Sequence, residues 1–95
     1  MLIGLPKEIK NNEFRVGLIP TSVSELVKSG HQVLVQSGAG AGIGAADAAY
    51  QAAGAMISPT AEQVFQDAEM IVKVKEPQEQ EWAQLSPHQI LFTYL

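Results

Sequence analysis

The sequence predicts an α/β fold in which helices cover both faces of a parallel sheet. Short apolar runs alternate along the chain with segments of helical periodicity, an order typical of βαβ units. The run from Val33 to Val35 is apolar without alternation, as in a parallel strand that is covered on both faces. The chain has 95 residues and is 46% hydrophobic, which suits one small domain.

Five segments are predicted to be strands, because each is short, apolar and bounded by turn-forming or charged residues. They are residues 2–5, 31–36, 55–57, 70–74 and 89–95. We expect them in the order 2-1-3-4-5, which would make the sheet Rossmann-like, of the flavodoxin-like type.

The first two helices are predicted from the residues at their ends. Ser22, followed by a glutamate three positions later, has the spacing of a capping box, and Gly30 suits a left-handed stop, so residues 22–29 should be helical. Asp47 should cap a second helix, which Gly54 ends. Both helices are therefore expected to lie between predicted strands.

Two further helices follow the same logic. Thr60, with a glutamine three positions later, should cap a helix that runs to about Ala68. Pro77 should open a polar helix whose buried side consists of Trp82 and Leu85. After it the chain returns to an apolar strand and stops there, which suggests that the domain continues in the parent protein.

Charge and composition argue against several classes of function. A net charge of -4 with only six Lys and Arg residues is unlike a nucleic-acid-binding protein, which concentrates cations to neutralise phosphates. The absence of cysteine fits a reducing compartment, so the cytoplasm is the expected location. Neither a signal peptide nor an apolar run of about 18 residues is present, so no membrane association is expected. The two histidines have no neighbouring acid at ligand spacing, so no metal site is expected.

The segment GLPKEIKNNEFRVGLIP, residues 4–20, is the first candidate for a functional site. It is far longer than the roughly 2–6 residues that usually connect elements of an α/β unit, and it is rich in charge. Phe14, Val16 and Leu18 alternate with Arg15, so we expect an extended arm with Arg15 on the face opposite Phe14. The arm is predicted to present Arg15 to an anion.

Lys75 is the second candidate, because it stands at the carboxyl end of the fourth predicted strand. On an extended chain it shares a face with Lys73. Ligands of open α/β sheets bind beyond the carboxyl ends of strands, so Lys75 and Arg15 should converge on one crevice. Such a pair suits a small carboxylate, which Arg grips with two hydrogen bonds. The alternative is that both are ordinary solvated surface charges.

The glycine-rich run SGAGAGIG contains Gly40-x-Gly42-x-x-Ala45, a formal match to a dinucleotide-binding fingerprint. That fingerprint also requires an acidic residue at the end of the next strand, whereas residues 55–57 run into Ser58. We therefore favour a structural turn over a phosphate cradle, and no cofactor-binding residue is predicted in the chain.

The acidic residues are expected to have mainly structural roles. Glu8 and Glu13 should pair with Arg15 or Lys7 and so shape the arm, with a role in acid–base catalysis as the alternative. The remaining acids near a helix start, expected to be favourable partners of the helix dipole, are Glu76, Glu79 and Glu81.

A resemblance to a known family covers essentially all 95 residues, and the segments that carry it are GLPKEIKNNEFRVGLIP, VSELVKSGH, VQSGAGAGIG, YQAAGA, VKVKEP and LFTYL. In these segments the chain resembles the N-terminal part of alanine dehydrogenase, in the family shared with the alpha subunit of nicotinamide nucleotide transhydrogenase. The resemblance departs from the family pattern at Ile19, where Ser or Thr is usual, and at Ala45, where an aromatic is usual.

The resemblance implies an NAD-dependent enzyme that interconverts L-alanine with pyruvate and ammonium. It implies that Arg15 binds the substrate carboxylate and that Lys75 both binds the substrate and acts catalytically, by polarising the carbonyl or imine. Residues 1–95 would be the N-terminal portion of the substrate-binding domain. A catalytic histidine would follow Leu95, and the NAD-binding domain would lie outside the chain. The isolated chain should then be inactive, and the full-length protein a homo-hexamer.

Two alternatives remain open at this point. The chain would fit the soluble domain of a proton-translocating transhydrogenase, although VKVKEP and LFTYL favour alanine dehydrogenase. It would also fit a non-catalytic α/β module that retains the sheet without the reaction.

Overall fold

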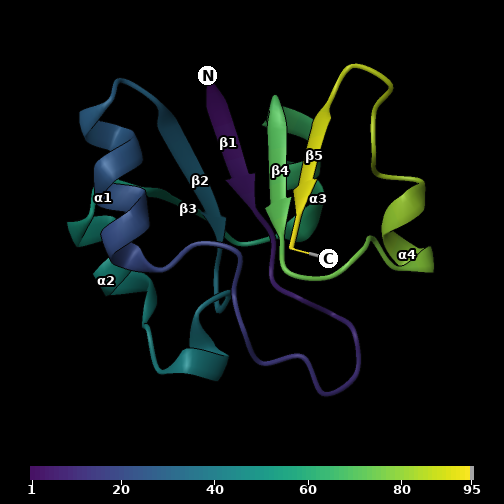
Figure 1. Cartoon of the computed structure of the whole chain (residues 1–95), viewed down its shortest axis with the longest axis horizontal. Coiled ribbons are helices and arrows are strands. Elements are labelled where there is room, and N and C mark those ends of the chain that lie inside the picture. The colour runs from purple at the N-terminus through teal and green to yellow at the C-terminus, as the bar shows by residue number, and fades with distance from the viewer. Residues whose placement is uncertain (95) are drawn as a thin grey trace.

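Five parallel strands form one sheet at the centre of the structure, a computed structural model that describes residues 1–94 (Figure 1). The last position of the predicted fifth strand, Leu95, lies outside the described residues. The elements in chain order are β1 (Leu2–Leu5), α1 (Pro20–Lys28), β2 (Gln32–Gln36), the 3₁₀ turn η1 (Ala41–Ile43), α2 (Asp47–Ala52), β3 (Met56–Ser58), α3 (Ala61–Asp67), β4 (Met70–Lys73), α4 (Glu79–Trp82) and β5 (Ile90–Thr93). The predicted α/β class is confirmed, and the predicted strands are present with small shifts at their ends.

The predicted strand order is wrong. The sheet has the order β3-β2-β1-β4-β5, so β2 is an interior strand and β3 lies at the edge. Burial explains the difference: Val33, Leu34 and Val35 of β2 are all buried, which requires a neighbour on each side and a covering layer on each face. The three-residue strand β3 is short enough to serve as an edge.

This order places β1 directly beside β4, with Ile3 opposite Met70 and Gly4 opposite Ile71. The chain builds outward from β1 through β2 to β3 and then returns to the other side of β1. The reversal is the topological switch point of the sheet, where a crevice opens beyond the carboxyl ends of the strands. The segment after β1 and the segment after β4 both leave the sheet at this crevice.

Helices cover both faces of the sheet, as predicted. One apolar cluster joins α1 and α2 to the sheet through Val23 and Tyr50, neither of which is exposed to solvent. A second cluster joins α3 to the opposite face through Val64 and Phe65. Because each face buries its own apolar residues, the sheet is a rigid base for the loops at its carboxyl edge.

The helix ends agree only in part with the expected caps. Helix α1 begins at Pro20, not Ser22, because proline fits the first turn and no side chain caps this end. Asp47 is the first residue of α2, not its cap. Gly30 has a φ of +94°, the expected left-handed stop, and Thr60 caps α3 by accepting a hydrogen bond from the Gln63 N–H.

The predicted polar helix is much shorter than expected, and Trp82 is 62% exposed where burial was predicted. The residue that α4 buries is Glu81, which is 3% exposed. Glu81 turns inward because a buried cation lies within reach, and the four-residue helix has no second turn with which to bury Trp82 as well. Leu85 does pack partly against the cluster under α3.

Candidate functional site

The arm, residues 6–19, lies beneath the carboxyl edge of the sheet as a long loop (Figure 1). It forms no strand, so the expectation of a regular extended segment is not met. Two tyrosines hold its C-terminal half. The Tyr50 hydroxyl donates to the Leu18 carbonyl at 2.7 Å, and the Tyr94 hydroxyl donates to the Gly17 carbonyl at 2.9 Å. The arm is therefore a fixed loop at the switch point.

Arg15 and Glu13 form a close ion pair on this arm. The Arg15 Nε lies 3.1 Å from Glu13 Oε2, and its Nη2 lies 2.9 Å from Glu13 Oε1. The hydrogen bond from the Arg15 side chain is the largest cause that lowers the pKa of Glu13 from 4.5 to about 2. The pair in turn raises the pKa of Arg15. The prediction that Glu13 pairs with Arg15 is confirmed.

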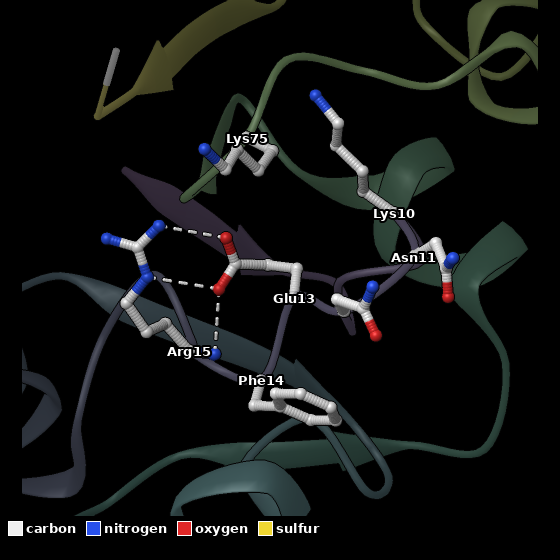
Figure 2. Close-up of a pocket in the computed structure, with 7 residues that line it drawn as sticks. Lys10, Asn11, Glu13, Phe14, Arg15 and Lys75 are labelled. Carbon is white, nitrogen blue, oxygen red and sulfur yellow. Dashed lines mark hydrogen bonds and ion pairs between the residues drawn. The ribbon is translucent and has the colours of Figure 1, made fainter.

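Arg15 and Lys75 meet at one pocket of about 430 Å³, shown in Figure 2. The residues that line it are Lys10, Asn11, Asn12, Glu13, Phe14, Arg15 and Lys75. Figure 2 shows the Lys75 ammonium and the Arg15 guanidinium on the same side of Glu13, with Phe14 directed away from them. The structure thus brings together the two cations that the sequence singled out, and their roles remain predictions.

Lys75 follows β4 by two residues and is only partly exposed. Within residues 1–94 its ammonium makes no ion pair or hydrogen bond, whereas the neighbouring Lys10 is paired with Glu76 at 2.7 Å. The Lys10 ammonium is the main cause that lowers the pKa of Glu76 to about 2. Lys75 is therefore the lining cation whose charge is left for a ligand in the described part of the chain.

A buried ionic network that was not predicted from the sequence is linked to Lys75 through Glu8. The Lys73 Nζ lies 3.2 Å from Glu8 Oε1 and 3.1 Å from Glu81 Oε2, and all three side chains are at most 4% exposed. Lys73 therefore does not share a surface with Lys75. Glu8 pairs with Lys73, not with Arg15 or Lys7, and Glu81 is an ion-pair partner more than a dipole partner.

Glu8 also holds the main chain that carries Lys75. Its Oε2 accepts the Val74 N–H at 2.9 Å, and its Oε1 accepts the Lys75 N–H at 3.2 Å. A single carboxylate of the arm thus fixes the exit of β4. The sequence carried one signal for this network, because a lysine within a strand covered on both faces requires buried carboxylates.

The glycine-rich run does not fit a dinucleotide. A Cβ on Gly42 would lie 2.2 Å from the Phe14 carbonyl oxygen, so the open side of this glycine is filled by the arm. The Gly38 N–H donates to Asp47 Oδ1 at 2.9 Å, and this bond is the main cause that lowers the pKa of Asp47. An internal carboxylate thus takes the donor that a phosphate would use, which supports a structural role for the run.

Two kinds of feature are absent from residues 1–94. No three His, Cys, Asp or Glu side chains there form a group that could hold a metal ion. No helix in this part of the chain is long and apolar enough to cross a bilayer.

Comparison with known proteins gives a consistent family. The family model described as alanine dehydrogenase/PNT, N-terminal domain, matches residues 4–95. The chain is similar to proteins named alanine dehydrogenase from Mycolicibacterium smegmatis, with 52% identity, and from Bacillus subtilis, with 54% identity. Both matches cover 100% of this chain but only 26% and 25% of those proteins. The chain thus spans about a quarter of the length of these relatives.

Two solved structures resemble the whole chain. One, named L-alanine dehydrogenase, has a TM-score of 0.96 and 53% identity over 26% of its own length. The other, a transhydrogenase from Sinorhizobium meliloti, has a TM-score of 0.92 and 32% identity over 28% of its length. Both therefore share the fold, and the first is closer in sequence.

Proposed function

Because this chain belongs to the alanine dehydrogenase/PNT N-terminal domain family, we propose that its parent protein is an NAD-dependent alanine dehydrogenase. The reaction would interconvert L-alanine with pyruvate and ammonium. In this proposal residues 1–95 are the N-terminal portion of the substrate-binding domain. The observation that carries it is the meeting of Arg15 and Lys75 in one pocket at the switch point of the sheet.

Arg15 would bind the substrate carboxylate. Its guanidinium is planar and permanently charged, so it can grip a carboxylate with two parallel hydrogen bonds. Its side chain is 66% exposed and borders the pocket, so a small molecule can reach it. This role supplies binding and orientation, which are needed before any bond is made or broken.

Lys75 would lie beside the reacting carbon of the same small molecule. An ammonium without an ion-pair partner, as Lys75 is within residues 1–94, stabilises negative charge as it develops on a carbonyl oxygen, and it polarises an imine in the same way. The buried Glu8 carboxylate holds the Lys75 main chain in place. The main-chain position from which this side chain extends is therefore fixed before the substrate arrives.

The reaction also requires a hydride, which NAD supplies as NADH. The glycine-rich run of this chain does not fit a dinucleotide, so we assign the cofactor to a part of the parent protein outside these residues. The proposal for this chain is confined to binding and polarising the substrate. We accordingly expect the isolated chain to be inactive.

The other partners follow from the same proposal. The substrate is a small molecule, and the net charge of -4 gives no support for nucleic-acid binding. We propose a homo-hexamer in the cytoplasm without association with membranes. The cysteine-free composition agrees with that compartment.

One alternative has a specific observation in its favour. The resemblance to a transhydrogenase structure would suit the soluble domain of a proton-translocating transhydrogenase, which moves hydride between nucleotides. The 32% identity of that match is well below the 52% to 54% of the alanine dehydrogenases. A non-catalytic α/β module is the further alternative, but it does not explain why Arg15 and Lys75 line the same pocket.

Substitution in the full-length protein tests the proposal. Arg15→Ala and Lys75→Ala should each reduce turnover of alanine by roughly a hundredfold or more, because each removes a charge that acts on the substrate. The affinity for NAD should stay nearly unchanged. The measurements are steady-state kinetics and cofactor titration, with Lys28→Ala on the exposed end of α1 as the matched control.

Normal turnover in either variant would refute the assigned role of that residue. A parent protein that fails to bind pyruvate would refute the proposal as a whole, whereas hydride transfer between nucleotides without alanine turnover would support the transhydrogenase alternative.

A further inference from the structure

The Arg15 guanidinium offers two edges to a carboxylate. The side edge consists of Nε–H and one N–H of Nη2, and the end edge consists of the other N–H of Nη2 and one of Nη1. Glu13 occupies the side edge, with distances of 3.1 Å from Nε and 2.9 Å from Nη2. Among the described residues nothing bonds to Nη1, so the end edge is available.

Glu13 is itself held in place. Its Oε2 accepts the Arg15 main-chain N–H at 2.9 Å in addition to the side-chain bond. The Glu13 side chain is 6% exposed, whereas that of Arg15 is 66% exposed. The anchored partner is therefore the carboxylate, and the guanidinium projects from it into the pocket.

The available edge and the second cation belong to residues that line the same pocket. Figure 2 shows Nη1 of Arg15 directed away from Glu13, with the Lys75 ammonium on the same side of Glu13 as the guanidinium, and both residues line the pocket. A carboxylate bound at the end edge would reach Arg15 without displacing Glu13, and the rest of the molecule would occupy the pocket that Lys75 also lines. A guanidinium held by both side-edge bonds loses little further freedom when it binds a ligand.

We infer that Glu13 is a positioning residue, which holds the side edge of Arg15 so that its end edge receives the substrate carboxylate beside Lys75. The inference rests on the proposed function, because it presupposes that Arg15 binds the substrate. It differs from a competing role, in which Glu13 would mimic the substrate carboxylate and would have to leave.

The test is a double-mutant cycle in the full-length enzyme, with Glu13→Gln, Arg15→Lys and the combination of both. In Glu13→Gln the KM for pyruvate should rise roughly tenfold, because a neutral amide binds the Arg15 guanidinium weakly and allows it to rotate. The kcat and the KM for NADH should stay within about twofold of the wild-type values. In the Arg15→Lys background, Glu13→Gln should raise the KM for pyruvate by a further factor of less than about two, because lysine has no planar guanidinium for Glu13 to hold. Glu62→Gln on the exposed start of α3 is the matched control.

Glu13→Asp provides a second route if the glutamine variant does not fold, which NADH binding and thermal unfolding would report. Aspartate keeps the charge but is one methylene shorter, so the KM for pyruvate should rise by an intermediate amount. An unchanged or lower KM in Glu13→Gln, or in Glu13→Asp if only that variant folds, would overturn the inference. Equal effects of Glu13→Gln in the wild-type and Arg15→Lys backgrounds would also overturn the inference.

The failure of the proposed function and the failure of the inference give different results. If Arg15→Ala retains normal turnover, the proposed function itself fails. If Arg15→Ala loses turnover while the Glu13 variants behave as wild type, only the inference fails.

Discussion

At the scale of single residues, the Glu13 carboxylate shows how strongly a local pair can perturb an ionisable group. It accepts three hydrogen bonds from Arg15, from the main-chain N–H, Nε and Nη2. The pKa of Glu13 falls from 4.5 to about 2 as a result. Because the folded pKa lies below the ordinary value, the pair stabilises the folded state fully above pH 4.5 and loses this contribution as the pH falls toward 2.

This behaviour predicts a titration. In Arg15→Ala the pKa of Glu13 should return toward 4.5, because the variant removes the side-chain hydrogen bonds that lower it most. Nuclear magnetic resonance of a carbon-13-labelled Glu13 carboxyl measures the midpoint in both proteins. A wild-type midpoint close to the ordinary value would contradict the prediction, and Glu62, on the exposed start of α3, serves as an internal reference.

At the scale of elements, one buried cation joins three parts of the fold. Lys73 of β4 bonds Glu8 of the arm and Glu81 of α4, so the arm and the short helix are both held to the end of one strand. Such pairs are costly to break, because the remaining charges stay out of water.

Lys73→Met should therefore lower the free energy of unfolding by about 3–5 kcal/mol, because it leaves two buried carboxylates without a cation. Chemical denaturation of the protein measures this loss, and Lys28→Met on the exposed end of α1 is the control. A loss no larger than that of the control would show that water reaches the network.

At the scale of the whole molecule, the switch point brings distant parts of the chain together. Strands β1 and β4 are neighbours, so the arm and Lys75, which follow them, lie at the same carboxyl end of the sheet. The predicted order would have placed another strand between β1 and β4. Tyr50 and Tyr94 then secure the arm from 32 and 77 residues away. The site therefore depends on the assembly of the entire sheet.

Removal of these ties should have unequal effects. Tyr50→Phe should lower the free energy of unfolding by about 1–3 kcal/mol, because Tyr50 is fully buried and the Leu18 carbonyl loses its donor. Tyr94 is 51% exposed, so water can replace its hydroxyl in Tyr94→Phe and the loss should be smaller. Equal losses in denaturation experiments on the two variants would contradict this ranking.

The sequence predicted much of the fold because its signals are local. The cap at Thr60, the stop at Gly30 and the apolar run of β2 each depend on residues a few positions apart. Two predictions were wrong, the burial of Trp82 and the order of the strands, because both depend on residues that are far apart in the sequence. Trp82 is exposed because Glu81 takes the inward side of α4, and that choice depends on Lys73 in another element.

The amino-acid sequence was enough to predict the α/β class and to place Arg15 and Lys75 beyond the carboxyl ends of the strands. Periodicity, turn chemistry and charge suffice for these, because they act over short distances along the chain. The folded structure was needed to show that β1 adjoins β4, that Lys73 is buried between Glu8 and Glu81, and which edge of Arg15 is bonded to Glu13. These features depend on which distant groups become neighbours, and desolvation on folding selects those partners.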